Sequence, residues 1–292
     1  MSAAQAEGQK TMPSRHGMNP ELITALFDDA ALFPPGNAAM TDAVRRHRQD
    51  QKLWYAASVG PFVCPDTRLV ELDRALGAAG LDRLDVALTV PDGARTLPAA
   101  LDAARATPRV RVVAVELPLG SAPVASVRDA LDGSDPSIDG YVEVPAAQLS
   151  TDLAARLQSA RLRLKLRTGG TSAAAFPTED ELARALTRSA GQGLAIKCTA
   201  GLHHAVRHRD PDTGFEHHGF LNVMLAVHAV LTAADARAAL AEQDSAVVAA
   251  AIAALSTTQI AAIRDVFRSF GTCSIDEPLA DLAKLDLLSV TA

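Results

Sequence analysis

The chain has 292 residues, of which 48% are hydrophobic, and this is enough for one large α/β barrel or two ordinary domains with a full core. A net charge of -6 and few aromatic residues argue against a nucleic-acid-binding surface, so the expected partner is a small molecule. Three widely spaced cysteines argue against a disulfide framework and favour a cytoplasmic location, and no long uncharged apolar run predicts a membrane span.

Eight short apolar or β-branched runs follow one another along the chain. Residues 1–20 are polar and are expected to form a disordered tail, and no linker is evident from residue 21 to residue 292. Amphipathic helical patterns, such as 66–79, 97–106 and 178–190, separate most of the runs. The alternation predicts a single α/β domain over 21–292, a (β/α)8 TIM barrel. Its predicted strands are 25–33, 55–63, 84–90, 111–117, 140–144, 162–168, 193–199 and 267–273.

The stretch 202–266 is much longer than one crossover of such a barrel. It begins with a histidine-rich polar loop and continues as alanine-rich helices, with start signals at Thr232-x-x-Asp235 and Ser256-x-x-Gln259. We interpret it as an insertion between strands seven and eight, with the loop at the catalytic end and the helices outside the barrel. Their apolar content suggests that they pack against another surface. That surface could belong to a second subunit of a homo-oligomer.

Two of the five lysines stand inside strand-like segments. Lys165 and Lys197 each precede a glycine, Gly169 or Gly201, by four residues. A buried ammonium group is costly unless it is paired. On neighbouring parallel strands the two side chains would lie about 5 Å apart, and their repulsion would lower the pKa of one amine by roughly 2 units. A neutral amine of this kind forms Schiff bases with carbonyl substrates.

Further polar residues fall on the same inner face of the predicted strands. Side chains at the carboxyl ends of barrel strands face the active site, and alternate residues of a strand share a face. We therefore expect a charged floor in which Lys165, Lys197, Glu116 and Glu143 are catalytic and Arg167, Thr199 and Asp28 bind substrate. The alternative is that these residues form structural ion pairs inside the barrel.

Five of the eight histidines fall within residues 203–218. One interpretation is a lid in which His203 and His204 contact the substrate and no metal is bound. A second is a metal site built from His204, His208, His217 and His218, because the spacing His204-x3-His208 is typical of two ligands on one helical turn. A third is a solvated loop. Cys273 lies near a strand end, and no base adjoins it in the sequence.

Several segments resemble the class I deoxyribose-phosphate aldolases. Residues 165–169 resemble the family's strand-six Lys-x-x-Thr-Gly motif. In the family a helix that begins with a Thr-x-Glu-Asp pattern follows this strand, and Thr-Glu-Asp at 178–180 resembles that helix start. Residues 197–202 are similar to the strand-seven lysine motif, 27–34 to the first strand and 270–274 to the eighth. The resemblance thus touches strands one, six, seven and eight in order.

The resemblance implies that Lys165 forms the Schiff base, that Lys197 lowers its pKa, and that Glu116 stands near the acidic proton shuttle, where the family uses aspartate. The family's phosphate-binding glycine pair is replaced by Ala200-Gly201, and Ser274 to Glu277 reads as a capping box whose carboxylates compete for the helix end. A small, non-phosphorylated carbonyl substrate is therefore expected.

The favoured hypothesis is a cofactor-independent class I aldolase or related carbon-carbon lyase. A metal-dependent hydrolase or lyase built on the histidine loop is the first alternative. A barrel that binds a metabolite without turning it over is the second.

Overall fold

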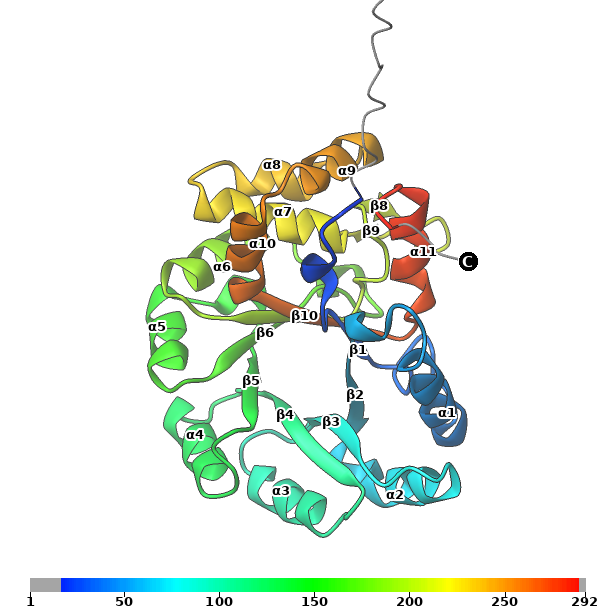
Figure 1. The fold of residues 1–292 in the computed structure, drawn as a ribbon. Coiled ribbons are helices and arrows are strands. Elements are labelled where there is room, and N and C mark those ends of the chain that lie inside the picture. Colours follow the sequence, from blue (N-terminus) through cyan, green and yellow to red (C-terminus); the bar gives the residue numbers. More distant parts are fainter. Residues whose placement is uncertain (1–16, 289–292) are drawn as a thin grey trace, which may run out of the picture.

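The computed structural model describes residues 17–288, and eight parallel strands in it form a closed barrel (Figure 1). Around the barrel the strands follow the order β1-β10-β7-β6-β5-β4-β3-β2, so neighbours in sequence are neighbours in space. The predicted (β/α)8 fold is confirmed. The barrel strands are β1 (Phe27–Asp29), β2 (Val59–Pro65), β3 (Leu84–Thr89), β4 (Val110–Pro118), β5 (Asp139–Glu143), β6 (Arg163–Arg167), β7 (Ile196–Thr199) and β10 (Phe267–Thr272).

A ring of helices covers the outside of the barrel (Figure 1). Each buries an apolar stripe against the strands, as Leu182, Ala185 and Leu186 do in the helix after β6. That helix starts at a capping box in which the Thr178 and Glu181 side chains each bind the other's backbone N–H. The crossover helices are α1 (Met40–Asp50), α2 (Leu69–Ala78), α3 (Leu97–Arg105), α4 (Val124–Asp132), α5 (Thr151–Ser159) and α6 (Glu179–Gly191), and α11 (Asp276–Lys284) follows the last strand.

The predicted insertion lies between β7 and β10. It contains a short antiparallel hairpin, β8 (His208–Arg209) and β9 (Glu216–His217), and then α7 (Phe220–Leu231), α8 (Ala236–Ala241), α9 (Ser245–Ala253) and α10 (Thr257–Val266). Figure 1 shows α8 and α9 outside α7, farther from the strands. No single helix within residues 17–288 is long and apolar enough to cross a membrane. Only α9 and α10 taken together are long and apolar enough, and they are bent by 109° relative to each other.

Several boundaries differ from the sequence prediction, three of them as follows. Residues 1–16 of the expected tail lie outside the described residues, but Met18 is buried and its N–H donates to the Leu287 carbonyl, so the boundary expected at residue 20 lies earlier. The first strand is shorter than predicted because Asp29 Oδ1 accepts the Ala31 N–H and turns the chain. Residues 56–58 form a 3-10 helix and not the start of β2.

Two of the expected helix starts, at Thr178 and at Ser256, are confirmed, and two are wrong. Ser256 and Gln259 form the predicted capping box of α10. Asp235, and not Thr232, caps α8, because Thr232 ends the preceding helix. The capping box expected from Ser274 to Glu277 does not form: the N–H of Ser274 donates to the Thr272 hydroxyl, and the Glu277 carboxylate turns to a histidine.

Candidate active site

The two strand lysines lie side by side on neighbouring strands inside the barrel. Lys165 on β6 is in direct register with Lys197 on β7, and Arg167 is in register with Thr199 one step closer to the carboxyl end. Both lysines are buried. A small buried apolar cluster of Val63, Ala87, Ala114 and Tyr141 also lies on strands of the barrel. The buried lysines therefore share the interior of the barrel with apolar side chains.

One carboxylate joins the two lysines. Glu116 on β4 binds Lys165 Nζ through Oε2 at 2.9 Å and accepts a hydrogen bond from Lys197 Nζ through Oε1. Lys197 also donates to Asp28 on β1, whose Oδ2 accepts the Ser269 hydroxyl at 2.8 Å. A carboxylate thus stands between the two ammonium groups and offsets the repulsion expected from the sequence.

The chain of charges continues toward the carboxyl end of the barrel. Glu143 on β5 lies 3.1 Å from Lys165 Nζ through Oε2 and accepts the Arg167 Nε–H at 3.0 Å through Oε1. Positive and negative groups therefore alternate without a break, and three cations balance three carboxylates. Arg167 is half exposed, whereas both lysines are buried. This charged chain of side chains therefore runs from the buried interior to the mouth, which is the open carboxyl end of the barrel. In order, it is Asp28, Lys197, Glu116, Lys165, Glu143 and Arg167.

Burial and neighbouring charges move the pKa values of these groups in different directions. Burial raises the pKa of Glu116, but the charges of Lys165 and Lys197 and their hydrogen bonds outweigh it and lower that pKa to about 2. At Asp28 burial is the stronger effect, and the pKa is raised despite Lys197. Burial lowers the pKa of Lys197, yet the charges of Asp28 and Glu116 raise it above its ordinary value. The two neighbouring carboxylates thus favour the charged form of Lys197.

Two glycines bring the ends of β6 and β7 together. A Cβ on Gly169 would lie 2.7 Å from the Gly201 Cα, and Gly201 has a φ of +73°, which favours glycine. This close approach explains why each lysine strand ends on glycine. Beside β1, Gly60 leaves the space that the Asp28 carboxylate fills, since an added Cβ would overlap its Oδ1.

Sequence reasoning missed Tyr141, which lies directly below the charged chain. Its ring centroid is 5.2 Å from Lys197 Nζ, and its hydroxyl accepts a hydrogen bond from Arg163 at 3.0 Å. Tyr141 precedes Glu143 by two residues on β5, so the same alternation that selected Glu143 also indicates Tyr141. The ring gives the sealed end of the site an aromatic wall.

The histidine loop lies at the carboxyl end of the barrel, as expected. His203 Nδ1 is 3.0 Å from Glu277 Oε2 and His204 Nδ1 is 2.8 Å from Asp281 Oδ2, so both histidines bind α11. The hydrogen bond with Asp281 raises the pKa of His204. His217 packs on Phe176, in the segment between β6 and α6, with ring centroids 4.6 Å apart. The loop thus joins the segments that follow β6 and β10.

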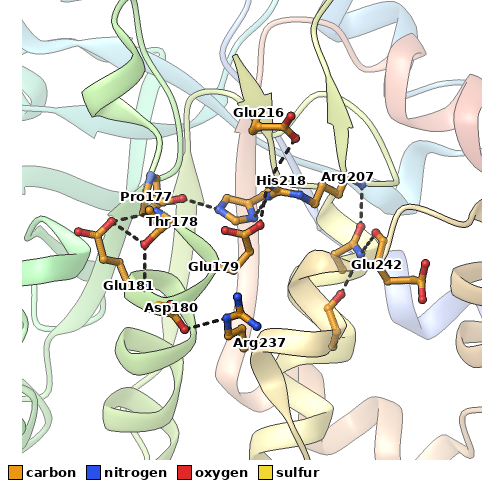
Figure 2. A network of polar contacts seen from close by, with 12 residues as sticks. Pro177, Thr178, Glu179, Asp180, Glu181, Arg207, Glu216, His218, Arg237 and Glu242 are labelled. Atoms are coloured by element: carbon orange, nitrogen blue, oxygen red, sulfur yellow. Dashed lines mark hydrogen bonds and ion pairs between the residues drawn. The ribbon is translucent and has the colours of Figure 1, made fainter. Parts of the chain in front are cut away.

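Figure 2 shows how the base of this loop is fixed. Arg207 is buried and binds Glu179 at 2.8 Å and Glu216 at 3.3 Å. The neighbouring His218 has Nε2 at 2.7 Å from the Pro177 carbonyl. These contacts tie the hairpin to the start of α6.

Asn222 completes the anchor. It is fully buried, its Oδ1 accepts the Arg207 N–H at 2.8 Å, and its amide donates to the carbonyls of Ala239 and Glu242. Every strong polar group of the side chain is used in holding the loop to α7 and the residues around α8.

The four histidines of the alternative metal site are not brought together as one ligand set. His218 is turned to Pro177 and Arg207, away from the others. His204 and His208 pack edge to face at 4.6 Å, and His208 and His217 stand at 5.2 Å between ring centroids. Burial lowers the pKa of both His208 and His217. In the described chain these histidines form a packed aromatic row.

A surface cavity of about 370 Å³ opens on the other end of the barrel. It is lined in part by Arg128, Arg161, Arg163 and Arg268, and neither Lys165 nor Lys197 borders it. In enzymes with this fold, the active site lies at the carboxyl ends of the strands. The charged chain, and not this cavity, is therefore the candidate active site.

No family model and no curated protein matches this sequence. Among solved structures, the chain is similar to a protein from Coccidioides immitis that is provisionally named a fructose-1,6-biphosphate aldolase. The identity is 10%, the TM-score is 0.32, and the match covers 75% of this chain and 84% of that one. This is a distant likeness. The fold is established by the closed strand order itself, and the deoxyribose-phosphate aldolases remain a resemblance of motifs.

Proposed function

We propose that this protein is a lyase of the class I aldolase type, in which Lys165 forms a Schiff base with a small carbonyl substrate. The observation that carries the proposal is the setting of Lys165: its Nζ lies between two carboxylates, 2.9 Å from Glu116 and 3.1 Å from Glu143, at the carboxyl end of a barrel. Lys165 is also the more exposed lysine, with 9% of its side chain accessible against 2% for Lys197.

The two carboxylates beside Lys165 take different roles in this proposal. Glu116, with its low pKa and two lysine partners, stays ionised and fixes both ammonium groups. Glu143 is closer to the mouth and accepts the proton that Lys165 must lose. The free amine then attacks the substrate carbonyl carbon, and Glu143 returns the proton to the carbinolamine hydroxyl, which leaves as water and gives an iminium ion.

The iminium ion withdraws the electron pair of the neighbouring C–C bond. As this bond breaks, the hydroxyl on the departing carbon gives its proton to Glu143 and becomes the carbonyl of the released product, and the electron pair of the bond gives an enamine. Glu143 then returns the proton to the enamine carbon, and hydrolysis of the iminium frees Lys165. The Lys197 charge, held by Asp28 and Glu116, keeps a fixed positive group beside the reacting nitrogen. No resident cofactor is needed for these steps.

The mouth favours a polar substrate without phosphate. Arg167 and Thr199 stand in register above the lysines and can hold a hydroxyl or carboxylate, with His203 and His204 nearby on the loop. The first turn of α11 carries Asp276 and Glu277, whose negative charges occupy the helix end that would otherwise attract a phosphate.

The test is a carbon-carbon bond assay with a panel of short hydroxyaldehydes and 2-keto acids. We expect turnover in the native protein, none with Lys165→Ala, and native turnover with Lys52→Ala, which changes an exposed lysine outside the site. Full activity in Lys165→Ala would overturn the proposal. Tight binding of a carbonyl compound without any turnover would favour the metabolite-binding alternative.

A further inference from the structure

Three side chains with different metal-binding atoms converge at the barrel mouth. His203 follows β7, Cys273 follows β10, and Glu277 lies in the first turn of α11. Their ligand atoms all lie within 4.8 Å of one another. Within residues 17–288 this is the one group of three or more histidine, cysteine or acidic residues placed in this way. The sequence separates the three by up to 74 positions, so only the fold assembles them.

The spacing of the three atoms fits a tetrahedral cation. With Zn–N and Zn–O bonds near 2.0 Å and a Zn–S bond near 2.3 Å, tetrahedral angles require edges of about 3.3 Å between N and O and about 3.5 Å between N and S. The His203 Nδ1 lies 3.0 Å from Glu277 Oε2 and 3.7 Å from Cys273 Sγ. Both distances come within a few tenths of an ångström of those edges, which small side-chain rotations provide.

We propose that His203, Cys273 and Glu277 form a binding site for a divalent transition metal of the zinc class. Imidazole and thiolate ligands favour zinc over magnesium or calcium, which take oxygen ligands. Three protein ligands leave a fourth position open, as in sites where a metal holds a water or a substrate oxygen. The His203 side chain is 17% exposed and that of Glu277 is 44% exposed, so the cluster lies at the surface of the mouth.

The surroundings of the cluster hold the thiol in place. A Cβ on Gly36 would lie 2.9 Å from the Cys273 Cβ, so the segment after β1 packs directly against the cysteine. On the other side, Asp281 in α11 binds His204 and the Ala205 N–H and thereby fixes the chain that carries His203. The ligands are therefore held by three separate parts of the barrel rim, as a preformed site requires.

This site differs both from the metal-free lid and from the four-histidine metal site that the sequence suggests. It uses only His203 of the five clustered histidines, and it includes Cys273, for which the sequence indicates no partner. It is also independent of the Lys165 chemistry, because neither barrel lysine is among the ligands. A metal here would bind and polarise an oxygen of a substrate that is held at the same end of the barrel.

The test is a titration of the chelator-treated full-length protein with Co²⁺, followed by competition with Zn²⁺. We expect the ultraviolet thiolate-to-cobalt charge-transfer band and the strong visible bands of tetrahedral cobalt. Cys273→Ser should abolish the charge-transfer band. Glu277→Gln and His203→Ala should weaken zinc binding by about tenfold or more.

His208→Ala is the matched control, because it removes a neighbouring histidine that lies outside the proposed set. It should leave both the cobalt spectrum and the zinc affinity unchanged. Thermal melts of each variant verify that it is folded. The proposal is overturned if the native protein gives no charge-transfer band with excess Co²⁺, if the band survives Cys273→Ser, or if His208→Ala abolishes it. The last result would make His208 a ligand beside a cysteine and would contradict the proposed set.

Discussion

Replacing Glu116 with glutamine tests the centre of the charged chain. The substitution keeps the size of the side chain but removes the one negative charge that both lysines share. Glu116 has its pKa lowered from an ordinary value of 4.5 to about 2, which at about 1.4 kcal/mol per pKa unit corresponds to about 3–4 kcal/mol of stability. Breaking a buried ion pair by removing one partner costs about 3–5 kcal/mol. We therefore expect Glu116→Gln to lose about 3 kcal/mol.

The pH dependence of this loss follows from the sign of the pKa change. A depressed carboxyl pKa stabilises the fold at pH values above the unfolded pKa, and this contribution disappears as the pH falls through the folded pKa. The difference between native protein and variant in urea unfolding should therefore be constant between about pH 6 and pH 8 and should shrink in acid. Glu71→Gln is the control, since Glu71 pairs with Arg68 on the surface and should change stability by less than about 1 kcal/mol. A loss for Glu116→Gln no larger than that of the control would refute the reasoning.

Three further changes test other parts of the account. Lys197→Met should move the pH midpoint for reductive trapping of the protein with aldehydes upward, because a fixed positive charge near the nucleophile is lost; an unchanged midpoint would contradict that role. Asn222→Ala should cost about 2–4 kcal/mol in urea unfolding and speed hydrogen exchange over residues 203–218, because the Arg207 N–H and two carbonyls lose their partner; slow exchange there would mean that other contacts anchor the loop. Gly60→Ala should lower thermal stability by about 1–3 kcal/mol, since its methyl group overlaps the Asp28 carboxylate; an unchanged melting temperature would place Asp28 elsewhere.

The barrel and the register of its lysines could be predicted because both depend on local patterns. Alternation of strands and helices fixes the fold class, and equal spacing of Lys165 and Lys197 from their glycines anticipates that they are paired in register. The same period of two along each strand correctly places Glu116 and Glu143 on the inner face.

Contacts between distant parts of the chain could not be predicted in this way. The sequence does not indicate that Glu116 stands between the two lysines, because that depends on side-chain reach across three strands of a closed barrel. Cys273 and His203 are 70 positions apart and meet only at the rim. The failed capping box at Ser274 has the same origin, since Glu277 finds a tertiary partner in His203 instead of its own helix end.

The central claim is that Lys165 is the nucleophile, and reductive trapping tests it most directly. The native protein would be incubated with borohydride and, in turn, acetaldehyde, glyceraldehyde and pyruvate, and the modified lysine would be located by peptide mass spectrometry. We expect one reduced adduct above background on Lys165 and none there in Lys165→Ala, with exposed Lys284 modified equally in both proteins. An adduct on Lys197, or modification of Lys165 no greater than that of Lys284 with every carbonyl compound, would contradict the account.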